Sequence, residues 1–120
     1  MITVKECYAQ IGGDYEDVLR RLSDEARIKR FLAKFLQDSS YADLLLNTEQ
    51  GNAPEAFRAA HSLKGICLNL GLSALAQSSS QLTEALRGCG EFSGTARELL
   101  ERVTADYEKT VRYIKLLIEG

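Results

Sequence analysis

Apolar residues recur at helical spacing along most of this chain. The strongest example is the set Ile28, Phe31, Leu32, Phe35 and Leu36, which follow one another at i, i+3, i+4, i+7 and i+8. This spacing places all five side chains on one face of an α-helix. Runs that alternate apolar and polar residues are absent, and the chain contains one proline. The pattern therefore predicts an all-α protein with essentially no sheet.

Glycine and serine clusters divide the chain into separate helical segments. After a short turn over residues 2–9, the expected helices span residues 14–22, 24–36, 40–50, 52–70, 72–86 and 93–118. Ser23 is the predicted N-cap of the second of these helices, with Asp24 and Glu25 in its first turn. Long helices joined by short loops favour an antiparallel four-helix bundle with one or two short accessory N-terminal helices. Without a linker or repeat, residues 1–120 are expected to form one domain.

Composition and charge exclude several functional classes. The formal net charge is -2, which argues against a nucleic-acid partner because such proteins normally carry a basic patch. The apolar stretches are too short for a membrane span, and the N-terminus lacks the pattern of a secretion signal. A cytoplasmic location is therefore expected, and the modest exposed apolar patch predicts a monomer. Cys7, Cys67 and Cys89 form neither a CxxC pair nor an even set, so we expect free thiols and no metal or other cofactor.

The segment from Asn52 to Gly71 carries the chain's single histidine, His61. Asn52 is the predicted N-cap of this helix, and Gly71 is the predicted residue just beyond its C-terminus. On a helical wheel one sector holds Ala56, Ala59, Ala60, Leu63, Ile66, Cys67 and Leu70, which form the predicted core stripe. The opposite sector holds His61 together with Phe57, Arg58, Lys64, Gly65 and Leu68.

Three features of this outer face favour a functional site over an ordinary surface. Phe57 and Leu68 are two large apolar residues that flank a histidine on a face expected to meet water, which is typical of a contact surface. Gly65 lies inside a helix, where it costs about 0.5–1 kcal/mol relative to alanine. Lys64 lies one turn from His61 and could neutralise an anion on its ring. An exposed imidazole beside an open notch suits nucleophilic catalysis by histidine. The competing interpretation is an ordinary surface histidine, a solvated lysine and a glycine at a helix–helix contact.

The run His61-Ser62-Leu63-Lys64-Gly65, followed by Gly71, resembles the H-x-L-K-G signature of histidine-containing phosphotransfer (HPt) domains. The resemblance covers about residues 10–118. It implies a helical-bundle phosphocarrier in which His61 takes a phosphoryl group from, or gives it to, the aspartate of a receiver domain in a response regulator or hybrid sensor kinase. It also implies that Lys64 and Gly65 support the phosphoryl site. The receiver would supply Mg²⁺ and most of the catalytic groups, and the carrier would have no ATP site or kinase activity.

The chain departs from the HPt pattern in the helix that follows. Members of the family often carry Glu or Gln directly after the leucine that matches Leu82, whereas this chain has Thr83. Gln81 and Glu84 are adjacent but are expected to point elsewhere. Arg87 matches a basic position of some members. Thr83, Arg87 and Arg58 are therefore the further candidates for support of the phosphoryl site, and Phe57 and Leu68 are the candidates for the partner surface.

Three alternatives remain open from the sequence. The first is an interaction module of the same fold in which His61 is not phosphorylated. The second is an unrelated structural bundle that associates with itself through Phe57 and Leu68. The third is a metal or haem bundle, which a single histidine and the absence of inward Glu-x-x-His pairs argue against.

Overall fold

The computed structural model describes residues 1–119, and the part it describes contains seven α-helices and no strand. The helices are α1 (Val4–Gln10), α2 (Tyr15–Leu22), α3 (Glu25–Phe35), α4 (Ser40–Glu49), α5 (Ala53–Asn69), α6 (Ser73–Leu86) and α7 (Gly94–Glu119). The all-α prediction is confirmed, and the expected helix boundaries differ from the observed ones by a few residues at most. Within residues 1–119, no helix combines the length and apolar character needed to cross a membrane.

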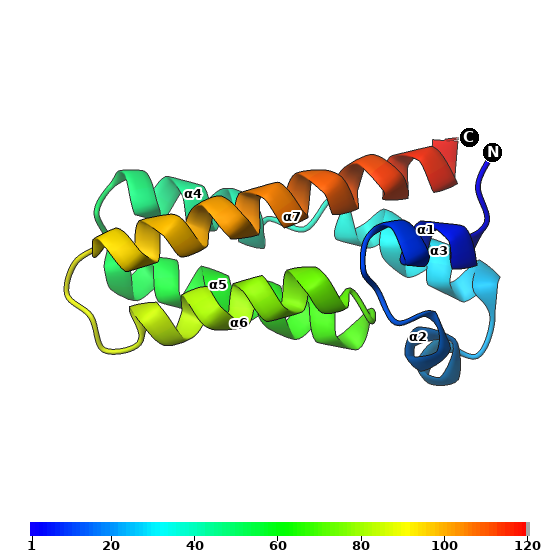
Figure 1. Ribbon diagram of the computed structural model, residues 1–120, viewed down its shortest axis with the longest axis horizontal. Helices are drawn as coiled ribbons and strands as arrows, with labels where there is room; N and C mark the ends of the chain where they lie inside the picture. The colour runs from blue at the N-terminus through cyan, green and yellow to red at the C-terminus, as the bar shows by residue number, and fades with distance from the viewer. Residues whose placement is uncertain (120) are drawn as a thin grey trace.

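The bundle consists of α4, α5, α6 and α7, which run in alternating directions (Figure 1). Helix α5 packs between α4 and α6, and α6 packs against the first part of α7. Helix α3 continues the line of α4 and contacts the second half of α7, so α1 and α2 are the accessory helices of the predicted architecture. The four-helix prediction is therefore confirmed, with α3 as an extension of one side of the bundle.

The predicted amphipathic stripes supply most of the core. On α3, Ile28, Leu32 and Phe35 are buried, and on α6 the buried set includes Leu75, Leu82 and Leu86. Phe31 is an exception because it is 37% exposed and lies under the ammonium of Lys34, 5.4 Å from the ring centroid. It lies at the edge of the stripe, beside a hollow that Ile66 and Leu70 also border.

Two helix caps also differ from the sequence prediction. Ser23 ends α2 with a positive φ of 77°, and the carboxylate of Asp24 caps α3 by accepting from the amide of Arg27 at 2.8 Å. The prediction of Ser23 as the N-cap of α3 is therefore wrong by one residue. In place of the expected turn over residues 2–9, Val4–Gln10 form a helix, because Thr3 and Glu6 make a reciprocal capping box at the start of α1.

The N-terminal segment is attached to the turn between α5 and α6. The buried Tyr8 hydroxyl donates to the carbonyl of Leu70 at 2.7 Å. The amide of Asp14 donates to the carbonyl of Gly71 at 2.8 Å, and the amide of Ala74 donates to the carbonyl of Gly12 at 3.1 Å. Since Gly71 has a φ of 65°, it also provides the left-handed residue that ends α5. These bonds fix the position of α1 and α2 at one end of the bundle.

Thiol reactivity is expected to separate the three cysteines. Cys7 and Cys67 are fully buried, and burial raises the pKa of both thiols, that of Cys7 to about 11. Cys89 is exposed in the loop after α6. Because the thiolate is the reactive form, a maleimide at neutral pH should label Cys89 quickly in the folded protein and all three cysteines after denaturation. Rapid labelling of Cys67 in the folded state, measured by peptide mass spectrometry, would contradict the core described above.

Candidate functional site

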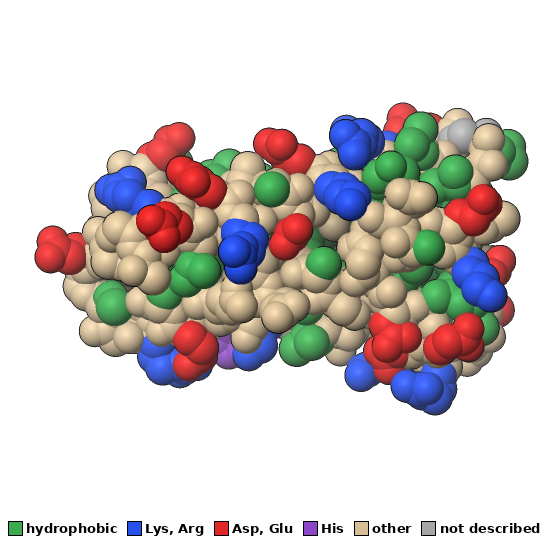
Figure 2. Space-filling model, viewed as in Figure 1, with side chains coloured by type: hydrophobic (Ala, Val, Ile, Leu, Met, Phe, Trp, Pro, Cys, Tyr) green, Lys and Arg blue, Asp and Glu red, His purple; other side chains and the backbone are tan. Residues whose placement is uncertain are grey.

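Helix α5 presents the histidine to solvent on the face opposite the core. Asn52 caps the helix by accepting from the amide of Glu55 at 3.3 Å, and Pro54 lies in the first turn. The predicted core stripe is buried except for Ile66, which is half-buried at its edge. His61 is exposed, and Figure 2 shows the histidine at the lower edge of the molecule with basic side chains on both sides. The orientation of α5 therefore agrees with the helical-wheel prediction.

The His61 ring rests against a second aromatic ring one turn earlier. The centroids of Phe57 and His61 are 6.0 Å apart, and the two rings meet edge to face at 75°. Phe57 is half-buried and packs against the core, so it is less exposed than the sequence indicates. The guanidinium of Arg87, at the end of α6, lies over the Phe57 ring at 5.1 Å. Arg87 and His61 thus use the same phenyl ring as a support.

Glu84 is the site residue that sequence reasoning missed. Its carboxylate accepts hydrogen bonds from Arg87, the shortest of them 2.8 Å long. These bonds lower the pKa of the Glu84 carboxyl, and the charges of Arg87, Lys64 and His61 lower it further. Because Arg87 lies over Phe57, its bonds with Glu84 place this carboxylate at the edge of the histidine surface. Three-residue spacing from Arg87 was the available signal, because an i, i+3 pair shares one face of a helix.

Gly65 lies one turn after His61, and the space that a side chain would occupy at this position is open. A Cβ built at this position would meet no described atom of another turn or helix within 4 Å. The alternative of a helix–helix contact at Gly65 is therefore wrong. The glycine leaves an open notch beside His61, and half-buried Lys64 lies at the border of the same notch.

Two of the further candidates lie away from this surface. Thr83 is fully buried, and its hydroxyl donates to the carbonyl of Ser79 at 2.7 Å, so it cannot support a group on His61. Thr83 packs on the buried side of α6, and the apolar spacing of α6 alone does not predict this burial. Arg58 is exposed on the side of α5 that faces α4, where it forms an ion pair with Glu55 at 3.4 Å.

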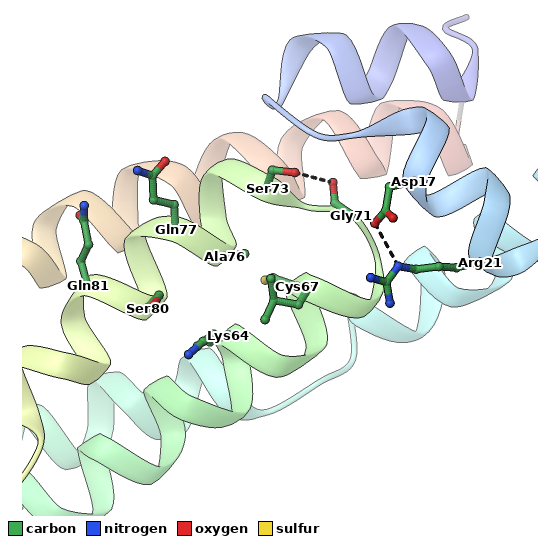
Figure 3. Close-up of a pocket in the computed structure, with 11 residues that line it drawn as sticks. Asp17, Arg21, Lys64, Cys67, Gly71, Ser73, Ala76, Gln77, Ser80 and Gln81 are labelled. Atoms are coloured by element: carbon green, nitrogen blue, oxygen red, sulfur yellow. Dashed lines mark hydrogen bonds and ion pairs between the residues drawn. The ribbon is translucent and has the colours of Figure 1, made fainter.

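A groove runs along the seam between α5 and α6, next to the notch. It has a volume of about 520 Å³ and is bordered by Lys64, Cys67 and Leu68 from α5, by Ala76 and Ser80 from α6, and by Arg21 from α2 (Figure 3). We call it the α5–α6 groove. Leu68, which is 51% exposed, forms an apolar edge of the groove, in agreement with its predicted place on the outer face.

The chemistry of this surface is that of an exposed nucleophile with cationic side chains around it. Among residues 1–119, no three His, Cys, Asp or Glu side chains are grouped closely enough to hold a metal ion. The groups near His61 are an imidazole, an ammonium, a guanidinium and a single carboxylate. Such a set can accept an anionic group on the ring and neutralise part of its charge.

The fold and this surface together define a helical bundle that displays one histidine from the middle of a helix. A family model described as the Hpt domain matches residues 15–112, which is well over half of the chain. The chain therefore belongs to the Hpt domain family, whose members carry phosphoryl groups in two-component signalling and lack a kinase catalytic region. No match was found among curated proteins or among solved structures.

Proposed function

We propose that this chain is a phosphorelay intermediate that carries a phosphoryl group on His61, to or from the aspartate of a receiver domain. The observation that carries the proposal is the exposed imidazole beside a mid-helix glycine with no packing partner. A glycine that weakens its helix and supports no contact has its simplest explanation in a partner that needs the space. Lys64 and Gly65 are the proposed support residues. Arg87 is a further candidate, and Phe57 and Leu68 belong to the partner surface.

The transfer requires only a nucleophile on this side of the interface. Free imidazole is substantially neutral at physiological pH, so one ring nitrogen offers a lone pair. When that nitrogen attacks phosphorus, a P–N bond forms, the P–O bond to the receiver's aspartate breaks, and the aspartate leaves as a carboxylate. Lys64 neutralises part of the charge on the phosphorylated ring, and the reverse step regenerates free His61. The chain acts in this scheme as a carrier, as one domain and as a monomer.

The experiment uses receiver domains from the same genome, each radiolabelled on its aspartate and mixed in turn with the chain. At least one receiver should transfer its label, and the product should be labile in acid and stable in base, as a phosphoramidate is. His61→Gln should abolish labelling completely, because glutamine has no nucleophilic nitrogen. The matched control is Ser62→Gln, at an exposed neighbouring position that faces the α4 side of the helix.

The outcomes distinguish the proposed carrier from a module that only binds. Labelling of the wild type and Ser62→Gln, with none in His61→Gln and an unchanged circular dichroism spectrum, is the expected result. A receiver that binds both His61→Gln and the wild type without labelling either one would show an unphosphorylated interaction module of the same fold. Labelling that survives in His61→Gln would place the acceptor elsewhere and overturn the proposal.

A further inference from the structure

The accessory helix α2 contributes a cation to the α5–α6 groove. Arg21 borders the groove from the end opposite the notch, and its side chain extends toward the groove from α2 (Figure 3). Its Nε atom donates to the Asp17 carboxylate at 3.0 Å, which fixes the direction of the guanidinium. The groove therefore has one cation at each end, Arg21 on α2 and Lys64 on α5.

The charge of Arg21 is only partly neutralised. Asp17 is shared between two arginines, because Arg20 also pairs with it at 2.8 Å. With Lys64 at the other end, two cations and one carboxylate border the groove, and that carboxylate also pairs with Arg20 outside it, in a chain whose overall formal charge is -2. A local excess of positive charge on an acidic protein favours contact with an acidic partner segment.

The backbone that carries Arg21 is fixed in place because α2 is attached to the turn that ends α5. The amide of Asp14, the N-cap of α2, donates to the carbonyl of Gly71, and Val18 is fully buried. Arg21 is thus held relative to His61 through α5 itself rather than through a flexible arm. A cation whose backbone is fixed before the partner arrives loses less entropy on binding than one on a segment that must first be ordered.

The walls of the groove suit a helix as the occupant. On α6 the small side chains Ala76 and Ser80 border the seam and leave room for a helix to approach it, with Gln77 and Gln81 beside them as polar contacts. On α5 the exposed Leu68 offers an apolar contact. An amphipathic helix laid in a groove with apolar and charged anchors is a common mode of recognition.

We propose that Arg21 is a specificity determinant of the carrier, which binds an acidic residue on the helix that the receiver lays along the α5–α6 groove. The inference rests on the proposed function, because the groove is continuous with the His61 surface through Lys64. It adds a contact outside the four-helix bundle, supplied by an accessory helix.

The test compares two neighbouring arginines on α2. The receiver is the one that exchanges phosphoryl groups with the wild-type chain. Arg21→Glu is expected to raise the receiver concentration that half-saturates transfer by about tenfold or more, which corresponds to about 1.4 kcal/mol. Arg20→Glu is the matched control, because Arg20 shares Asp17 but does not border the groove, and it should change the value less than twofold. Binding of unphosphorylated receiver, measured by fluorescence anisotropy in the His61→Gln background, gives a second readout that is independent of chemistry.

Salt provides a further criterion. The affinity of the wild type should fall as ionic strength rises, and that of Arg21→Glu should fall less steeply. Equal effects of Arg21→Glu and Arg20→Glu, with normal transfer by the wild type, would overturn this inference alone. Failure of every receiver to label the wild type would overturn the proposed function and this inference with it. A dimer of the free chain that Arg21→Glu dissociates, detected by sedimentation, would assign the groove to a second copy and contradict the receiver assignment.

Discussion

Replacement of Gly65 by glutamine is expected to slow phosphoryl transfer by about a hundredfold or more without loss of stability. The side chain would enter the notch one turn from His61, where the reacting atoms must approach to about 3–3.5 Å. The space is open in the free protein, so the new side chain meets no described neighbour within 4 Å at its Cβ. Glutamine is also a better helix former than glycine, which should stabilise α5 by up to about 1 kcal/mol. Rapid-quench transfer rates and thermal melting would measure the two effects.

Two controls make this result specific to the notch. Gly65→Ala should keep most of the transfer rate while gaining a similar increase in stability, because its methyl group fills little of the space. Ser62→Gln adds the same side chain on the α4 side of the helix and should change the rate by no more than about threefold. Transfer at full speed by Gly65→Gln would show that the phosphoryl group does not pass through the notch.

The second large effect concerns folding and is expected at Gly71. Gly71→Ala should lower the free energy of unfolding by about 2–4 kcal/mol, from the left-handed backbone and from crowding together. The φ of Gly71 is 65°, and its Cβ would lie 2.9 Å from the carbonyl oxygen of Asp14 and 3.2 Å from the Val18 side chain. Urea denaturation should show the loss as a lower midpoint with an unchanged slope.

Gly51→Ala separates the backbone contribution from the contact contribution. Gly51 has a similar φ of 70°, but no described atom lies within 4 Å of its Cβ position. This variant should therefore lose only the conformational part, about 1 kcal/mol. Equal losses of unfolding free energy in the two variants would mean that the N-terminal segment does not pack closely against the α5–α6 turn.

Helical periodicity predicted the features that depend on the sequence of one helix alone. The core stripe of α5, the solvent-facing position of His61 and the cap at Asn52 follow from helical spacing and from local hydrogen bonding, and the structure has all three. The Thr3 and Glu6 pair that caps α1 is present in the sequence. Because α1 is so short, its residues show little helical periodicity, and the sequence prediction gave only a turn there.

The features that sequence reasoning missed depend on neighbouring helices. The burial of Thr83 and the orientation of Glu84 are set by how α6 rotates against α5, and the apolar spacing of α6 does not determine that rotation closely enough. Phe31 fits the stripe of α3 but lies at its edge, beside Ile66 and Leu70, and stays partly exposed. The contribution of Arg21 to the groove arises from bonds between segments far apart in the chain, such as Asp14 to Gly71.

The shared use of Phe57 has an entropic consequence for docking. An exposed side chain normally loses rotamer freedom when a partner covers it, at a cost of about 0.5–1.5 kcal/mol for each side chain immobilised. Here His61 leans on the edge of Phe57, and Arg87, itself held by Glu84, lies over the same ring. These groups already restrict one another in the free protein. Docking of a partner therefore costs less side-chain conformational entropy at this surface, and the binding free energy is more favourable by that difference.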